Sequence, residues 1–341
     1  MGVKLKQFTN GKKIELKELN NKTISIDAFN TLYQFLATIR GPMGEPLKNR
    51  DGEITSHLTG LFYRNINLLN ANIKPIFIFD GKPPELKKKE IERRKEIKKD
   101  AKIKYEKAVE EKDEETAKKY AQMISRIEDY MIDDSKKLLD LLGIPWVEAP
   151  SEAEATAAHF TKIGKSDYTA SQDYDSILFG APNLIRNLTI SGRRKVPRKN
   201  VYVNVDPEVI ELKKLLEENN LSREQLIDIG ILIGTDFNPN GIRGIGPVTA
   251  VKYIKKYGKL EHINELKEKI QEIEYEQIRE IFLKPKITEP GDIKWNNIKK
   301  DKLVEFLCDE KGFSHDRIQN SLKKFEDSIK TRNQTLDKWF K

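Results

Sequence analysis

The stretch PIFIFDGKPP, residues 75–84, decides the fold because it sets a charged side chain at the end of an apolar run. Residues 76–79 are apolar on both sides of an extended chain, which is typical of a parallel strand covered on both faces. Asp80 then follows a buried strand. An ionised carboxylate beside an apolar core is costly unless a positive group meets it, so we expect a positive partner for Asp80.

A second run of this kind, TISID at residues 23–27, ends in Asp27, and helical pattern fills most of the chain between the two runs. This alternation predicts an α/β fold with a central, mostly parallel twisted sheet flanked by helices. In open α/β sheets, ligands bind beyond the carboxyl ends of the strands. We therefore expect Asp27 and Asp80 to converge on one site.

Composition narrows the class of protein. The net charge of +8 over 341 residues favours an anionic partner. The single cysteine, Cys308, excludes an intramolecular disulfide, and with four scattered histidines it leaves no cluster typical of a zinc site. No apolar stretch is long enough for a membrane span or a signal peptide, so we expect a cytoplasmic protein that does not bind membranes.

The segment from Glu85 to Leu142 contains no glycine or proline and is rich in helix-forming residues. Its apolar residues are too sparse for a wide amphipathic stripe, so we expect much of it to project from the body, with a turn at EEKDEET, residues 110–116. Lys87 and Arg94 are two helical turns apart and share a face. A solvated helix face is the plain alternative for these charges.

Further acidic residues lie in APSEAEA, residues 149–155, and in TASQDYDSILFG, residues 169–180. Ser151 and Glu154 match the capping box that begins a helix, which is a structural alternative to a functional role for Glu154. Glu152 has no such capping role. Asp173 and Asp175 lie on one side of an extended chain, although this spacing alone is common in loops.

Ser222 is expected to begin a helix that leads into LIGTDFNPNGIRGIGPVTAVKYIKKYG, residues 232–258. Gly241, Gly244 and Gly246 indicate a tight hairpin, and the proline that follows suits the first turn of a helix. The pattern over residues 222–258 resembles a helix-hairpin-helix, whose exposed backbone amides bind phosphate. An ordinary glycine turn is the alternative.

Carboxylates dominate the candidate site residues. Oxygen ligands without nitrogen or sulfur point to Mg²⁺, with Mn²⁺ as a substitute. Two such ions can activate a water and stabilise the departing oxygen in phosphodiester cleavage, while lysines and arginines around them hold nucleic acid. The seven candidates are Asp27, Asp80, Glu152, Glu154, Asp173, Asp175 and Asp236.

The motifs together resemble those of the structure-specific 5′ nucleases, most closely the archaeal flap endonucleases. In family order the chain carries ISIDAFNTLYQFL, TSHLTGLFYR, FIFDGKPPELK, APSEAEA, ASQDYDSILFG, LIGTDFNPNGIRGIGP and EFLCDEKGF. The resemblance covers nearly the whole chain. It implies a PIN-like nuclease fold over residues 1–329, with a helical arch at about residues 82–132 through or under which a 5′ single strand passes.

The resemblance also implies roles for single residues. The seven carboxylates would hold two metal ions, and Lys87 and Arg94 would contact the scissile phosphate. Tyr33 would stack on the base beside the cut, with a plain core role as its alternative, and Arg40 would contact DNA. The helix-hairpin-helix would bind the duplex backbone together with K⁺, and TSHLTGLFYR, residues 55–64, lies where the family holds a short 3′ flap.

The last residues, 330–341, resemble the family's sliding-clamp peptide, with Leu336, Trp339 and Phe340 as its apolar plug. Asn333 stands where a glutamine is expected, which weakens one polar anchor. A frayed terminus is the alternative.

These patterns predict a monomeric Mg²⁺-dependent flap endonuclease and 5′ to 3′ exonuclease that acts on branched DNA with a 5′ flap in replication and repair. Two rival hypotheses are a non-catalytic junction-binding protein that recruits the clamp and a metal-dependent phosphatase. The first leaves seven acids near phosphate without a purpose. The second needs a nucleophile in the first position of the DxD, which lies late in this chain.

Overall fold

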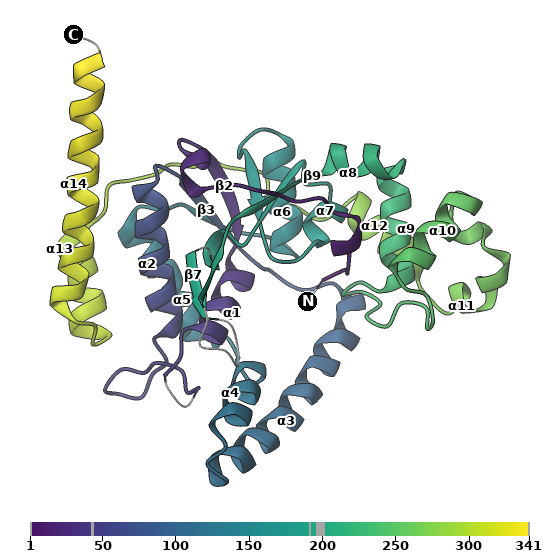
Figure 1. Cartoon of the computed structure of the whole chain (residues 1–341), viewed down its shortest axis with the longest axis horizontal. Coiled ribbons are helices and arrows are strands. Elements are labelled where there is room, and N and C mark those ends of the chain that lie inside the picture. The colour runs from purple at the N-terminus through teal and green to yellow at the C-terminus, as the bar shows by residue number, and fades with distance from the viewer. Residues whose placement is uncertain (1, 42–43, 191, 196–201, 340–341) are drawn as a thin grey trace.

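A computed structural model describes residues 2–41, 44–190, 192–195 and 202–339. Its core is a seven-stranded sheet in the order β1-β9-β6-β5-β2-β3-β4. The pairs β1–β9 and β9–β6 are antiparallel and the other four pairs are parallel, so the predicted mostly parallel sheet is confirmed (Figure 1). The strands are β1 (Lys12–Lys13), β2 (Thr23–Asp27), β3 (Lys74–Phe79), β4 (Trp146–Glu148), β5 (Tyr168–Ala170), β6 (Asn183–Arg186) and β9 (Glu208–Glu211). A separate antiparallel pair is formed by β7 (Gly192–Lys195) and β8 (Tyr202–Val205).

Strand β3 is buried on both faces, as its sequence predicts, because successive side chains point to opposite sides of a sheet. Phe77 and Phe79 belong to the core that includes helices α1 (Ala28–Thr38), α2 (Ser56–Asn70) and α5 (Asp129–Leu142). Ile76 and Ile78 pack on the other side with residues of α6 (Ala153–Lys162). Helices thus cover both faces of the sheet and leave the carboxyl ends of β2 and β3 to form a site.

The segment between β3 and α5 projects from the body as two helices, α3 (Lys88–Glu110) and α4 (Glu114–Met123), preceded by a short 3₁₀ turn (Figure 1). The turn between them falls within EEKDEET, as predicted, and Asp113 begins α4 by accepting a hydrogen bond from the Thr116 amide at 3.0 Å. The two helices lie against each other, and small side chains such as Ala101 and Ala117 are buried on them. This projection is joined to the body at both ends.

A lobe of helices lies beside the sheet, and its apolar core is shared with residues of β6, β9 and α6. It contains α7 (Asp175–Leu178), α8 (Leu212–Asn219), α9 (Arg223–Ile233), α10 (Pro247–Tyr257), α11 (Lys267–Gln271) and α12 (Tyr275–Leu283). Ser222 begins α9 with a capping box, as predicted, and accepts from the Gln225 amide at 3.1 Å. The buried Asp228 on α9 accepts two hydrogen bonds from Arg279 on α12, at 2.9 and 3.0 Å, which ties the lobe together.

The chain ends in α13 (Lys300–Val304), a π-helical turn (Glu305–Glu310) and α14 (His315–Trp339). Helix α14 packs along α2 and then extends away from the body (Figure 1). Leu336 and Trp339 lie in this helix and Phe340 falls outside the described residues, so the division predicted at residue 330 and the role of these side chains stay predictions.

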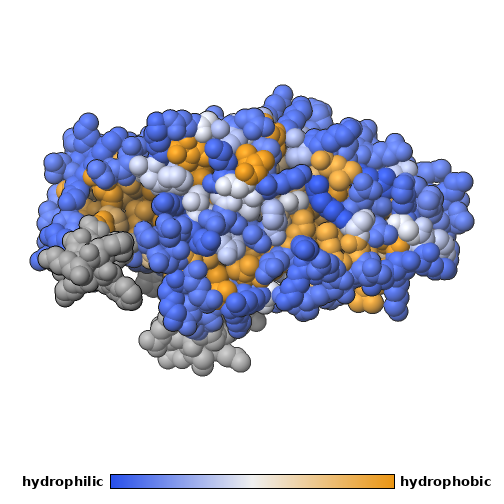
Figure 2. Space-filling model, turned by 90° about the horizontal axis from the view of Figure 1, so that it is seen from above, coloured by the Kyte–Doolittle hydropathy of each residue, from blue (hydrophilic) through white to orange (hydrophobic). Residues whose placement is uncertain are grey.

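Seen from above, the surface is mainly hydrophilic, with hydrophobic patches separated by hydrophilic side chains (Figure 2). Among the described residues, no helix has the length and apolar character needed to cross a bilayer.

The fold buries the titratable side chain of His57 in an apolar environment. His57 on α2 is 0% exposed, and neither of its ring nitrogens has a hydrogen-bond partner among the described residues. Its ring lies edge-on to Tyr130, with centroids 6.2 Å apart. Burial, helped by the charge of Lys311, lowers the pKa of His57 from 6.5 to about 3.

His57 should therefore make stability depend on pH. The unfolded chain takes up a proton near pH 6.5 and the folded chain does so only near pH 3, so stability is lost as the pH falls below about 6.5. At pH 5 this loss is about 2 kcal/mol. Other groups titrate in this range in both proteins, so the comparison isolates His57. Between pH 7.5 and pH 5, the change in the free energy of unfolding, measured with urea, should be less favourable by about 2 kcal/mol in the wild type than in His57→Phe, which keeps an aromatic ring beside Tyr130. Equal changes in both proteins would contradict the assignment.

Candidate active site

Two acids lie where parallel strands end. Asp27 is the last residue of β2 and begins α1, where its carboxylate accepts from the Asn30 amide at 2.9 Å. Asp80 directly follows β3 and accepts from the Ala153 amide at 2.6 Å. Because β2 and β3 are parallel neighbours, the two carboxylates meet at one edge of the sheet, as predicted.

The acids of APSEAEA come to the same edge at the start of α6. Glu152 occupies the position before the helix, and Glu154 is buried and accepts from the Ser171 hydroxyl at 2.9 Å. The capping-box alternative is wrong, because the Ser151 side chain does not cap α6. The carboxylate of Asp80 meets the first amide of the helix instead, which frees Glu154 for the cluster.

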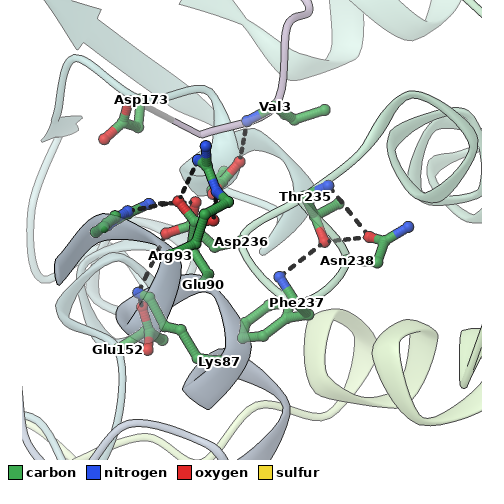
Figure 3. Close-up of polar contacts among 12 residues, drawn as sticks. Val3, Lys87, Glu90, Arg93, Glu152, Asp173, Thr235, Asp236, Phe237 and Asn238 are labelled. Carbon is green, nitrogen blue, oxygen red and sulfur yellow. Dashed lines mark hydrogen bonds and ion pairs between the residues drawn. The ribbon is translucent and has the colours of Figure 1, made fainter. Parts of the chain in front are cut away.

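The remaining acids arrive from two other segments. Asp173 accepts from the Asn30 side-chain amide at 3.0 Å, and Asp175, at the start of α7, accepts from the Val3 backbone amide at 2.7 Å. Asp236 lies in the turn after α9, which Asn238 closes by accepting hydrogen bonds from the amide and hydroxyl of Thr235 (Figure 3).

Two cations from the base of the projection point into this cluster. The Lys87 ammonium pairs with Glu152 and lies 3.4 Å from a carboxylate oxygen of Asp236. Arg94 donates from Nη2 to Asp236 at 2.7 Å. The plain alternative of a solvated helix face is therefore wrong for these two residues, since both face the acids.

The charges of the cluster are strongly coupled. Burial raises the pKa of Asp80 to about 6 and of Asp175 to about 7, and neighbouring carboxylates, Glu152 for the first and Asp236 for the second, add to the rise. Burial likewise raises the pKa of Asp27 and of Glu154 well above the usual range. Lys87 and Arg94 thus leave negative charge in the cluster without compensation.

Where Lys87 and Arg94 contact the acids, the pKa values shift in the direction that favours the charged forms. Burial would raise the pKa of Asp236, but the charges of Lys87 and Arg94 bring it below the ordinary value. Burial would lower the pKa of the Lys87 ammonium, but Glu152 and Asp236 raise it above the usual range. Lys87 is therefore charged at neutral pH.

Among the described residues, no three acidic, histidine or cysteine side chains are grouped in the geometry of a metal site as they stand. The chemistry of the cluster nevertheless fits divalent cations, since it offers only oxygen donors, and burial together with the charge of neighbouring carboxylates raises four carboxyl pKa values. The role of the seven acids as metal ligands stays a prediction.

Two further residues, Tyr33 and Arg40, are predicted to contact DNA. The Tyr33 side chain on α1 is 41% exposed and the Lys98 ammonium lies 5.2 Å from its ring centre, so the core alternative for Tyr33 is wrong. Arg40 is engaged within the protein, where it donates to the Gly44 carbonyl at 2.6 Å and to the Ser125 hydroxyl at 2.5 Å. Contacts of either residue with DNA stay predictions.

The glycine hairpin lies between α9 and α10, and Pro247 is the first residue of α10, as predicted. Gly241 has φ +51° and its backbone is packed so closely that an added Cβ would lie 2.5 Å from the Ile233 carbonyl carbon. Gly244 and Gly246 face open space, since an added Cβ would meet nothing within 4 Å. These two positions leave the amides before α10 open to a phosphate.

Gly246→Leu should fold normally but bind duplex DNA more weakly, because the side chain would stand between the backbone and the phosphate. We expect about a tenfold loss of affinity, by fluorescence anisotropy with a flap duplex, and an unchanged melting temperature. Gly291→Leu is the matched control, because Gly291 also faces open space and has no positive φ. Equal affinities for the two variants would contradict a phosphate seat at the hairpin.

Sequence reasoning missed several residues that hold the acids in place. The Val3 amide and Asn30 bind carboxylates of the cluster, and Gly2 lies so near that an added Cβ would be 2.8 Å from Asp175. Glu90 on α3 is buried between arginines, although its sequence position within a run of charges does not distinguish it from other acids of the helix. No spacing rule connects these residues to the acids, since most are distant in sequence.

Comparison with known proteins places this site in a family. Residues 1–101 match the XPG N-terminal domain and residues 143–236 match the XPG I-region. The chain is 51% identical to flap endonuclease 1 of Nitrosopumilus maritimus and 48% identical to that of Pyrococcus furiosus, and each alignment covers 100% of both chains. The solved structure of flap endonuclease-1 from Methanococcus jannaschii is 39% identical, covers 97% of this chain and 100% of its own, and superposes with a TM-score of 0.74.

Both XPG segments contain residues of the acidic cluster, and the relatives match from end to end. The chain therefore belongs to the flap endonuclease family of structure-specific 5′ nucleases.

Proposed function

We propose that this chain is a metal-dependent flap endonuclease, with 5′ to 3′ exonuclease activity, that hydrolyses a phosphodiester bond near the base of a 5′ flap. The observation that carries the proposal is the cluster of seven buried or half-buried carboxylates faced by Lys87 and Arg94, in a chain of this family. A protein that only bound junctions would gain nothing from concentrated acid beside phosphate.

The seven carboxylates would hold two Mg²⁺ ions, for which Mn²⁺ can substitute. When bound, such ions would activate a water for attack and stabilise the charge on the leaving oxygen. Asn30, Ser171 and the Val3 amide orient three of the carboxylates by hydrogen bonds, which limits the rotation of these ligand side chains.

Lys87 and Arg94 bind the scissile phosphate from the arch side of the cluster. Both cations are held at the cluster before DNA arrives, so charge that develops on the phosphate meets donors already in position. Tyr33 supplies an exposed ring on which the base beside the cut can stack, and Arg40 is a further proposed DNA contact from the loop after α1.

The rest of the chain holds the branched substrate. The amides at Gly244 and Gly246, on the hairpin that also contains Gly241, bind the backbone of the duplex, with K⁺ as a further ligand of that hairpin. The 5′ single strand passes through or under the arch formed by α3 and α4, whose surface carries many lysines.

One assay tests the proposal. End-labelled double-flap, nicked and single-stranded DNA are incubated with the protein, with and without Mg²⁺, and the cut sites are mapped. We expect cleavage near the base of the flap only with Mg²⁺. Binding without cleavage would favour the junction-binding alternative, and release of phosphate alone would favour the phosphatase.

We further propose that the enzyme acts as a monomer in Okazaki-fragment processing and DNA repair, and that it is recruited by a homotrimeric sliding clamp. The supporting feature is the C-terminal sequence around Leu336, Trp339 and Phe340. Two aromatics and a leucine can each contribute about 1.5 to 3 kcal/mol on burial, before the cost of ordering and of association is subtracted.

The clamp should therefore bind with about micromolar affinity, and most of it should come from the aromatics because Asn333 replaces the expected glutamine. Calorimetry should show binding largely lost in a Trp339→Ala, Phe340→Ala double variant and retained in Lys338→Ala, a polar change in the same segment. Clamp-free flap cleavage should be equal in all three proteins. Retained affinity in the double variant would place the clamp site elsewhere.

A further inference from the structure

An acid lies on the face of the arch that meets the phosphate, where a negative charge is unexpected. Glu90 is on the first turn of α3, between Lys87 and Arg94 on one helix face, and its side chain is only 2% exposed. Acids on lysine-rich helices usually form exposed ion pairs that contribute little to stability. Because Glu90 is buried beside the proposed phosphate site, we expect it to have a role other than that of an exposed ion pair.

Both carboxylate oxygens of Glu90 accept hydrogen bonds from arginines (Figure 3). Arg93 donates to them from Nε and Nη2, at 2.6 and 2.8 Å, and Arg94 donates from Nε at 2.6 Å. Burial would raise the pKa of Glu90, but these hydrogen bonds and charges lower it below the ordinary value. Glu90 is thus a fixed anion at neutral pH.

The contact with Glu90 determines how Arg94 faces the acids. A guanidinium is planar, so holding its Nε sets the direction of both terminal nitrogens. Arg94 directs Nη2 to Asp236 at 2.7 Å, and its Nη1 has no hydrogen-bond partner among the described residues. A phosphate at the cluster would find this nitrogen already oriented.

Arg93 neutralises the negative charge of Glu90, which would otherwise weaken the attraction of Lys87 and Arg94 for phosphate. Its side chain is 43% exposed and points its bidentate fork at Glu90, so the Arg93–Glu90 pair is neutral overall. Lys87 and Arg94 then remain as positive charges toward the cluster. Without Arg93, the negative charge of Glu90 would offset one of these two positive charges.

We propose that Glu90 is a positioning residue for cleavage: it holds Arg94 by Nε so that the terminal nitrogens of the guanidinium face the scissile phosphate. The inference rests on the proposed nuclease function and adds a residue to it. Misplacing a group by about 1 Å can cost about 100-fold in rate, so the loss on removing Glu90 should appear in the chemical step and little in binding.

The test compares Glu90→Ala, Arg94→Ala and the double variant in single-turnover flap cleavage with Mg²⁺, with flap affinity measured by anisotropy without Mg²⁺. Glu90→Ala should slow cleavage about 10- to 100-fold and change affinity less than about threefold. It should cause no further loss in the Arg94→Ala background, because Arg94 is then no longer there to be positioned. Glu90→Gln, which keeps one acceptor oxygen, should be intermediate.

Glu106→Ala is the matched control, since Glu106 is on the same helix and pairs with Lys102 in an exposed i, i+4 contact at 3.8 Å. It should cleave like the wild type. Equal losses from Glu90→Ala in both backgrounds, or a wild-type rate, would overturn the inference and leave the nuclease function standing. An inactive wild type would overturn both. If Glu90→Ala lowers the melting temperature too far, Glu90→Gln in the two backgrounds decides the matter by the same comparison.

Discussion

Replacement of Asp175 by asparagine should abolish flap cleavage, leave flap binding nearly unchanged and raise the melting temperature of the metal-free protein. The first effect follows because the variant loses a proposed metal ligand, and we expect a loss on the order of 1000-fold or more, about 4 kcal/mol of barrier. The fold should survive, since an asparagine oxygen can still accept the hydrogen bond from the Val3 amide.

The rise in melting temperature follows from the pKa of Asp175. Burial, with the charges of Asp236 and Asp173, raises this pKa from 3.8 to about 7. The folded chain therefore holds a proton that the unfolded chain has lost, and stability falls as the pH rises from about 4 through 7. Asparagine does not titrate, so its advantage over the wild type should be smaller at pH 5 than at pH 8 and should be reduced by Mg²⁺.

Single-turnover cleavage, anisotropy and thermal melts in EDTA and in Mg²⁺ measure the three effects. Asp301→Asn serves as the control, because Asp301 is exposed on α13 and lies outside the cluster. Full cleavage by Asp175→Asn would reject the metal assignment. If the melting temperature of Asp175→Asn had the same pH dependence as that of the wild type, the raised pKa of Asp175 would be contradicted.

Lys87→Met should slow the chemical step by about 100- to 1000-fold with a modest loss of flap affinity, because the lysine contact strengthens as charge develops on the phosphate. The same change should destabilise the protein in EDTA, since removing one partner of a buried ion pair costs about 3–5 kcal/mol. Mg²⁺ should restore most of that stability by neutralising Glu152 and Asp236, the acids that Lys87 contacts.

The neighbouring Lys88→Met is the control, because its ammonium pairs with the exposed Glu85, at 2.9 Å, outside the cluster. It should match the wild type in rate and in stability. A loss of affinity as large as the loss of rate in Lys87→Met would assign Lys87 to ground-state binding instead of the chemical step.

The parts of the fold that were predictable are those in which local pattern and tertiary role coincide. The apolar run before Asp80 can be buried only as a covered strand, and its parallel pairing with β2 brings Asp27 to the same edge. The turn of the arch and the start of α9 carry local signals as well, in EEKDEET and Ser222.

The parts that were not predictable depend on contacts between distant segments. Ser151 and Glu154 have the spacing of a capping box, but the Asp80 carboxylate takes the place of the cap from another strand. Arg40 is expected to contact DNA, but its guanidinium is held within the protein by the Gly44 carbonyl and the Ser125 hydroxyl. Glu90 has the same local signal as other acids of α3, and only its burial beside Asp236 and Arg94 distinguishes it.

The single cysteine makes the arch accessible to optical measurement. Cys308 lies in the π-helical turn with 7% of its surface exposed, and burial raises the pKa of its thiol, so it should react slowly with a maleimide dye. A cysteine introduced at the exposed Glu111, between α3 and α4, would then be the fast-labelling thiol, with no need to remove the natural one. A fluorophore at that point would report movement of the arch during the passage of a flap, molecule by molecule.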